Sequence, residues 1–197
     1  MNLYIYLPSP IMYTDTSLEI IKNIFNVKEI KYIKHLPYEE EINNGIFWIN
    51  SHGYSRNLSH DFLIQGFSKE YVNKDYIKYL VYDEKKYPFI PSKNFTKFFK
   101  VKNSIILFDS CYSSEIDMRT LGKWKSNLIF STGYITDKYN ENWSGLIKSI
   151  YCVFENLEKK KNVKKMDYNS IEENRDFINK YFEDILNKEF NTQFILF

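Results

Sequence analysis

Two continuous apolar segments constrain the fold of this chain more than any other feature of its sequence. They are Ile46-Phe47-Trp48-Ile49 and Ile105-Ile106-Leu107-Phe108. Because neither alternates apolar with polar residues, each predicts a strand buried on both faces, as in the centre of a parallel sheet. The first run leads directly into Asn50-Ser51-His52-Gly53 and the second into Asp109-Ser110-Cys111. The sequence therefore predicts a histidine and a cysteine immediately after two buried strands.

The rest of the chain alternates short apolar segments with segments of helical spacing. Further strands are predicted at residues 3–7, 30–33, 128–130 and 194–197. Helices are predicted after Asp15, which we interpret as a cap, in a short piece after Pro91, and over residues 143–158 and 170–188. Residues 54–91 predict a small hairpin at 62–67 within a polar surface loop. This alternation favours an α/β fold, a mostly parallel sheet with helices on both faces.

Such a sheet brings the histidine and the cysteine together. The carboxyl ends of parallel strands meet at one edge, and ligands bind beyond that edge. His52 and Cys111 each follow the carboxyl end of a predicted strand. We therefore expect both side chains at the same edge of the sheet.

The composition is typical of a single globular domain. Of the 197 residues, 44% are hydrophobic and 26% are charged. A net charge of +2 is too small to predict a nucleic acid or a membrane as partner, and no apolar stretch approaches the length of a membrane span. The first residues, MNLYIYLPSP, have neither a charged leader nor a long apolar core, so we expect a cytoplasmic protein. The two cysteines, Cys111 and Cys152, are then expected as thiols rather than as a disulfide.

A cysteine and a histidine at one edge predict acyl-transfer chemistry. A thiol is mostly protonated at neutral pH, and a neighbouring imidazole can take its proton and later give it to a leaving amine. The reaction also needs hydrogen-bond donors for the developing oxyanion. Gly53 has no side chain to block its amide N–H, and the amide of Cys111 is the second candidate donor.

At these residues the chain resembles the caspase and metacaspase superfamily of cysteine peptidases. That family places His-Gly after one core strand and the nucleophilic Cys after the next, and the caspase histidine lies roughly 50 residues upstream of the cysteine. In this chain Cys111 follows His52 by 59 positions. The Asp-Ser-Cys of residues 109–111 is closer to metacaspases than to animal caspases, which have Gln-Ala-Cys.

The resemblance covers essentially the whole chain and implies both a fold and an activity. The implied fold is caspase-like, a mostly parallel sheet of about six strands flanked by helices in the single domain 1–197, with a large-subunit-like part over about 1–120 and a small-subunit-like part over about 125–197. The implied activity is that of a cysteine endopeptidase acting on proteins or peptides, with His52 as general base and Cys111 as nucleophile.

The resemblance also implies a pocket for Arg or Lys before the scissile bond. The metacaspase pocket acid two residues before the nucleophile matches Asp109, and strand periodicity puts Asp109 on the same face as Cys111. A second pocket acid near the start of the first helix matches Asp15. Two alternatives stay open: Asp109 as a structural carboxylate that accepts bonds from loop amides, and Asp15 as a helix cap only. Asp137 is a weaker candidate.

Three departures from the metacaspase pattern surround the pair. Tyr112 replaces the usual His, Ser114 replaces the usual Gly, and Ser51 stands where many members have Gly. They motivate a second hypothesis, a catalytically weak or inactive caspase-like scaffold that acts as a binding or regulatory module. The oligomeric state stays open, because caspases pair through an edge strand whereas metacaspases are commonly monomers.

The remaining candidate residues have simpler interpretations. Cys152 lies on the apolar side of a predicted helix, His35 is a surface residue, and His60 would be the base only in a different fold. The basic run 159–165 is interpreted as a solvated loop, with self-processing as the alternative. No cofactor or metal is predicted. Some metacaspases need calcium, but the loop acids of this chain form no recognisable ligand array; they include Asp75, Asp83 and Glu84.

Overall fold

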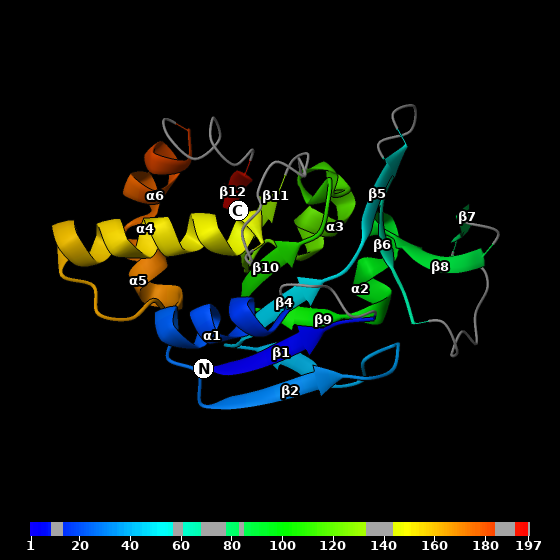
Figure 1. The fold of residues 1–197 in the computed structure, drawn as a ribbon, viewed down its shortest axis with the longest axis horizontal. Helices are drawn as coiled ribbons and strands as arrows, with labels where there is room; N and C mark the ends of the chain where they lie inside the picture. The colour runs from blue at the N-terminus through cyan, green and yellow to red at the C-terminus, as the bar shows by residue number, and fades with distance from the viewer. Residues whose placement is uncertain are drawn as a thin grey trace.

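The computed structural model describes residues 1–8, 14–56, 61–67, 78–82, 85–132, 144–183 and 192–196. Its centre is a six-stranded sheet in the order β12-β11-β10-β4-β1-β2. The strands are β1 (Asn2–Tyr6), β2 (Glu29–Ile33), β4 (Ile46–Asn50), β10 (Ile105–Asp109), β11 (Leu128–Thr132) and β12 (Thr192–Leu196). The first five run parallel, and β12 pairs antiparallel with β11 at one edge. The predicted α/β fold with a mostly parallel sheet is confirmed (Figure 1).

The two apolar runs form the middle of this sheet. Strand β4 pairs with β10 in the register Ile46↔Ile105 to Asn50↔Asp109, and all five residues of each strand are buried. Side chains on both faces of these strands are therefore removed from water, which is why neither run alternates apolar and polar residues. The same register aligns the ends of the two strands, so the chain leaves the sheet side by side at Ser51 and Ser110.

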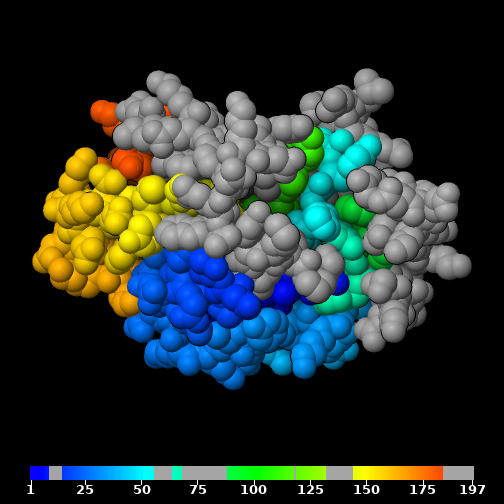
Figure 2. All heavy atoms as spheres, viewed as in Figure 1, coloured from blue at the N-terminus to red at the C-terminus, as the bar shows by residue number. Residues whose placement is uncertain are grey.

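Each face of the sheet has its own hydrophobic core. One core contains Leu3, Trp48, Leu107 and Phe130 and lies under four helices. These are α1 (Thr14–Ile24), α4 (Gly145–Lys161), α5 (Tyr168–Glu173) and α6 (Arg175–Tyr181). Figure 2 shows α1 and α4 side by side on this surface.

The opposite core contains Tyr6, Phe47 and Phe108 and lies under shorter helices. They are the 3-10 turn η2 (Ser92–Asn94), α2 (Phe95–Phe98) and α3 (Met118–Lys123). Phe95 and Phe98 are buried, as the predicted short helix after Pro91 requires. The sheet is thus covered by helices on both faces.

Residues 54–91 differ from the sequence prediction. Instead of one hairpin in a polar loop, the described residues form a four-stranded antiparallel sheet in the order β5-β6-β8-β7. Its strands are β5 (Gly53–Arg56), β6 (Asp61–Gln65), β7 (Lys78–Tyr82) and β8 (Lys85–Pro91). Two short parallel strands, β3 (Glu41–Asn43) and β9 (Lys100–Lys102), form a separate pair that was also not predicted. Strand β8 contains two prolines, which are unfavourable within strands and concealed it, although its Phe89 and Ile90 are buried.

Helix boundaries correct three further expectations. Helix α1 begins at Thr14, so Asp15 lies inside its first turn rather than before it. In place of the predicted helix 170–188 the structure has two helices, α5 and α6, with Asn174 between them, and residues 184–188 of the prediction lie outside the described residues. Helix α4 ends at Lys161, so the first three lysines of the basic run are helical instead of lying in a loop. Lysines in a last turn favour the helix because they face the negative end of its dipole.

Candidate active site

The segment that follows β4 packs directly on the segment that follows β10. A Cβ atom placed on Gly53 would lie 2.0 Å from the carbonyl oxygen of Cys111 and 2.9 Å from its amide nitrogen. No side chain fits in that space, so the close approach of the two backbones requires a glycine at position 53. A left-handed backbone is not the reason, because no glycine among the described residues has a positive φ. This contact places the His52–Gly53 peptide beside Cys111, as the sequence predicts for two residues at one sheet edge.

A second contact joins the residues just before the pair. The hydroxyl oxygens of Ser51 and Ser110 lie 3.0 Å apart, and both side chains are buried. The amide of Ser51 donates to the carbonyl of Asp109 at 3.3 Å. Residue 51 thus continues the contact between β4 and β10 one step beyond the sheet. Ser51, a departure from the metacaspase pattern, has a direct partner in Ser110.

The turn after Cys111 is compact and is bonded at several points. Tyr112 has φ 62° and ψ 17°, the left-handed region that residues other than glycine seldom adopt. The Ser113 hydroxyl donates to the carbonyl of Phe108 at 2.8 Å, and the Ser113 amide donates to the carbonyl of Ser110 at 3.2 Å. These bonds fold the chain back over the end of β10, and Tyr112 packs against the core under α2 and α3.

A side-chain contact also joins this turn to β5. The Ser55 hydroxyl donates to the Glu115 carboxylate, which lies at the end of the 3-10 turn η3 (Ser113–Glu115). Together with the Ser51–Ser110 pair, this bond connects the His52 segment to the Cys111 segment on both sides of the two reactive residues. The relative placement of His52 and Cys111 is therefore fixed by four neighbouring side chains.

The antiparallel ladder orients the Gly53 amide. The amide of Gln65 donates to the carbonyl of His52 at 2.9 Å, and Gly53 stands opposite Ile64 in the β5–β6 register. Residues in an antiparallel pair alternate between those that bond across the ladder and those whose N–H and C=O point outward. Since His52 bonds across to β6, the Gly53 N–H points away from β6. The orientation suits the predicted oxyanion role of Gly53.

The two reactive side chains differ in exposure. His52 is exposed, and Cys111 is half-buried. The backbone of Cys111 packs directly against Gly53. Both cysteines are thiols, and Cys152 packs partly buried against the core under α4.

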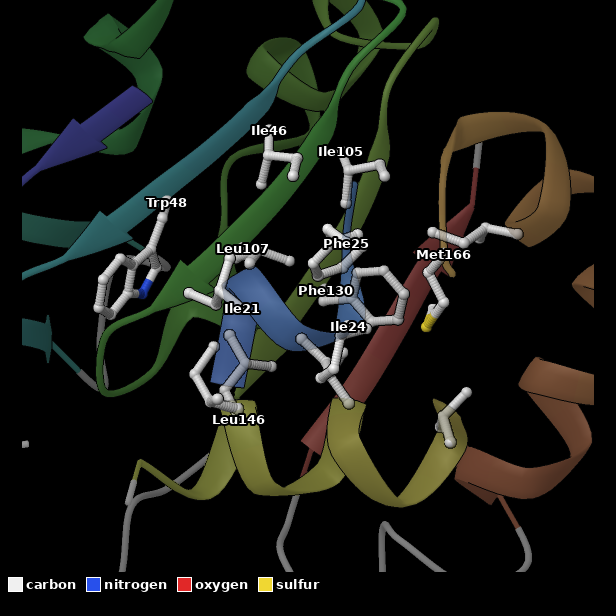
Figure 3. Packing of buried hydrophobic residues seen from close by; sticks show 14 of the residues in the cluster. Ile21, Ile24, Phe25, Ile46, Trp48, Ile105, Leu107, Phe130, Leu146 and Met166 are labelled. Carbon is white, nitrogen blue, oxygen red and sulfur yellow. The ribbon is translucent and has the colours of Figure 1, made fainter. Parts of the chain in front are cut away.

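Asp109 is a buried carboxylate, 6% exposed, on the face of the sheet that packs under α1 and α4. Its Oδ2 accepts long bonds from Trp48 Nε1 at 3.3 Å and from Asn50 Nδ2 at 3.4 Å. Burial raises the pKa of Asp109 to about 6, and hydrogen bonds from Ser144 and Trp48 oppose that rise. Figure 3 shows Trp48 and Leu107 among the side chains that point from the sheet toward these helices.

Ser144 connects Asp109 to helix α4. Its side chain accepts from the amide of Ile147 at 3.1 Å as the N-cap of α4, and it also hydrogen-bonds Asp109. The carboxylate therefore lies at the positive end of a 17-residue helix, where the dipole favours an anion. Neither Ser144 nor Asn50 is among the site residues predicted from the sequence. Strand periodicity could have found Asn50, because residues 48 and 50 share a face, and Asn50 is the register partner of Asp109.

The other candidate residues are exposed or lie outside the described residues. Asp15 is exposed in the first turn of α1, and His35 is exposed. His60, Asp75, Asp83, Glu84 and Asp137 lie outside the described residues or have no described side chain. Within the described ranges, no group of three or more His, Cys, Asp or Glu side chains is placed to hold a metal ion. None of the helices in the described part of the chain has the length and apolarity to cross a membrane.

Comparisons with known proteins give no match. No family model matches the chain, and no curated protein and no solved structure is similar to it at a significant level.

Proposed function

We propose that this protein is a cysteine endopeptidase of caspase-like fold that hydrolyses peptide bonds through Cys111 and His52, after Arg or Lys. The observation that carries the proposal is the contact between Gly53 and the Cys111 peptide, with the Cβ position of residue 53 only 2.0 Å from the Cys111 carbonyl oxygen. It brings a histidine and a cysteine from two neighbouring parallel strands to one sheet edge, where ligands of open α/β sheets bind.

The proposed reaction has two acyl-transfer steps. His52 takes the proton of the Cys111 thiol, and the thiolate attacks the substrate carbonyl carbon to give a tetrahedral oxyanion. The Gly53 N–H, directed away from β6, and the Cys111 N–H would donate to that oxyanion. His52 then gives the proton to the leaving amine as the C–N bond breaks. Water, deprotonated by His52, hydrolyses the thioester and regenerates the thiol.

The proposed specificity depends on Asp109. A carboxylate on the face next to Cys111 attracts a cationic substrate side chain and repels an acidic one. Helix α4 and the donors Trp48 and Ser144 stabilise the ionised form of Asp109. Asp15 lies in the first turn of α1, which packs on the same face, but its exposed position makes it the weaker candidate of the two.

Fluorogenic peptides that differ only in the residue before the leaving group test this proposal. Arg and Lys peptides should be cleaved and an Asp peptide should not. Cys111→Ala and His52→Ala should each lower kcat/KM by about 10³-fold or more, and the double variant should be no worse, because the two residues act as one unit. Cys152→Ala is the matched control and should keep full activity. A peptide inhibitor with a reactive group after Arg should add its mass at Cys111 and not at Cys152.

The alternative is a catalytically weak or inactive scaffold that binds peptides. Tyr112 favours it, because its side chain packs on the core beside the nucleophile in a conformation that costs energy. The same assay separates the two functions. Cleavage that Cys111→Ala abolishes supports the peptidase, whereas peptide binding without cleavage supports the scaffold.

A further inference from the structure

Asp109 is a buried carboxylate with no counter-ion among the described residues. No Lys, Arg or His of the described residues forms an ion pair with it, and its partners Trp48, Asn50 and Ser144 are neutral donors. Buried carboxylates are ordinarily paired with a cation or provided with several strong donors. The bonds from Trp48 and Asn50, at 3.3 and 3.4 Å, are longer than the usual range for N–H···O bonds. Within the described residues, the Asp109 carboxylate is thus stabilised by neutral donors and the end of α4, without a cation.

The neighbouring Asn50 has a buried acceptor atom for which the described residues provide no donor. Its side chain is 2% exposed, its Nδ2 is directed to Asp109, and its Oδ1 has no hydrogen-bond partner in the described part of the chain. The amide orientation follows from the carboxylate, because an oxygen facing Asp109 would be repelled. A buried acceptor without a partner is unusual and calls for an explanation, either a water or a ligand donor.

The Asp109 carboxylate and the unpaired Asn50 oxygen belong to adjacent residues. Asn50 and Asp109 are register partners on the two central strands, two residues before His52 and Cys111 respectively. One site thus contains an unbalanced negative charge and an unpaired neutral acceptor. A single group that carries a positive charge and several N–H donors would satisfy both.

We propose that Asn50 is a second specificity-determining residue of the substrate pocket and that, with Asp109, it makes the enzyme prefer Arg to Lys. This inference rests on the proposed function. A guanidinium is planar and has five N–H donors in a fixed fork, so it can donate to a carboxylate and to a second acceptor at once. An ammonium is a compact point charge that can pair with Asp109 but reaches the Asn50 oxygen less readily.

The test compares the Arg-to-Lys ratio of kcat/KM for two otherwise identical fluorogenic peptides. The wild type should prefer Arg by about tenfold, the discrimination expected from one hydrogen bond to a charged donor. Asn50→Leu, similar in size but without an acceptor, should lower that ratio to within about twofold of unity, with a smaller change for the Lys peptide. Since the ratio is measured within one variant, a loss of folded protein does not affect it, and Asn50→Ala provides a second variant.

Ser131→Ala is the matched control. Ser131 is fully buried, and its hydroxyl also has no partner among the residues that the structure describes. Strand alternation puts it on the face opposite to Phe130 and away from Asp109. This variant should leave the Arg-to-Lys ratio unchanged. An Arg-to-Lys ratio in Asn50→Leu within about twofold of the wild-type value would overturn the proposal. The Asn50 oxygen would then be expected to accept a hydrogen bond from an internal water.

A binding measurement separates this inference from the peptidase proposal. N-acetyl-arginine amide, N-acetyl-lysine amide and N-acetyl-citrulline amide are added to the Cys111→Ala protein, and the rise in Tm is recorded. The arginine compound should give the largest rise, and Asn50→Leu should remove its advantage over lysine. If this result is obtained but no peptide is cleaved, the proposed Arg-binding pocket is supported and the peptidase proposal is wrong. Equal effects of the three compounds would overturn the pocket.

Discussion

The hydroxyl oxygens of Ser51 and Ser110 lie 3.0 Å apart, one residue before His52 and one residue before Cys111. Both side chains are buried, so their bond is shielded from competition with water. It connects the two central strands at the point where each chain leaves the sheet. This pair offers a direct way to test whether the placement of His52 against Cys111 depends on the surrounding scaffold.

Breaking the serine pair should loosen the site more than it destabilises the fold. Ser51→Ala should lower the free energy of unfolding by about 1 kcal/mol, the usual net contribution of one hydrogen bond. The Ser51→Ala and Ser110→Ala effects should be non-additive by about 0.5–1.5 kcal/mol in a double-mutant cycle measured by urea unfolding. The rate of Cys111 alkylation by a peptide inhibitor should fall in each variant. Additive stability effects would show that the two hydroxyls do not interact.

Adding one methyl group at Gly53 should disrupt the site. In Gly53→Ala the new Cβ would lie 2.0 Å from the Cys111 carbonyl oxygen, so one of the two backbone segments must move. Overpacking of this kind costs about 1–3 kcal/mol, and we expect activity to fall at least about tenfold. Peptide turnover and urea unfolding measure the two effects.

Gly122 provides the matched control for this substitution. It lies in helix α3, and a Cβ there would meet nothing within 4 Å. Gly122→Ala should therefore raise the free energy of unfolding by about 0.4–1 kcal/mol through helix propensity and leave turnover unchanged. A Gly53→Ala protein as active as Gly122→Ala would mean that the contact with Cys111 is not essential.

Asp109 should make stability depend on pH in the acid range. Its pKa rises from 3.8 in the unfolded chain to about 6 in the folded protein because burial penalises the anion. Between these pH values the folded state binds more protons than the unfolded state, so stability falls as pH rises through this window. The penalty is absent below about pH 3.8, complete above about pH 6, and on the order of 3 kcal/mol.

Asp109→Asn isolates this effect from the other acids. Urea unfolding of the wild type and of Asp109→Asn, followed from about pH 4 to about pH 7, should show Asp109→Asn gaining stability relative to wild type as pH rises. A constant difference between the two proteins across that range would contradict the raised pKa of Asp109.

The ionisation of Asp109 should also affect substrate choice. The ratio of kcat/KM for an Arg peptide to that for a citrulline peptide should fall as pH decreases through about 6, because protonated Asp109 no longer attracts the guanidinium. Using a ratio cancels the titration of groups that act on both peptides alike. An Arg preference that is independent of pH would show that Asp109 does not contact the substrate side chain.

The helical end of α4 limits where the chain can be cut. Lys159, Lys160 and Lys161 form its last turn, and Leu157 beneath them is fully buried. Peptidases bind extended substrate, so we expect no cleavage after these lysines in the folded protein. If self-processing occurs within the basic run, mass spectrometry should find it after Lys164 or Lys165, and Cys111→Ala should prevent it. A cut after Lys160 in folded protein would require this turn to open.

Much of the architecture could be predicted from local sequence pattern. The runs at 46–49 and 105–108 are apolar without interruption because strands buried on both faces have no solvent side. That pattern, together with helical spacing elsewhere, predicts a mostly parallel sheet with His52 and Cys111 after two buried strands, whereas the direct pairing of these strands comes from the tertiary structure. Strand β8 could not be predicted in this way, because its two prolines count against a strand even though its Ile90 belongs to the core under α2 and α3.

Tertiary structure decided which neutral side chains surround the candidate site residues. Residue types alone indicated His52, Cys111 and Asp109, because each follows or ends a buried strand. The register Asn50↔Asp109, the Ser51–Ser110 bond and the Ser144 cap on α4 depend on how strands and helices far apart in sequence are aligned. No local preference encodes such an alignment, since it results from packing two cores against one sheet. The sequence by itself thus determined which reactive groups reach the edge, and packing determined which neutral side chains surround them.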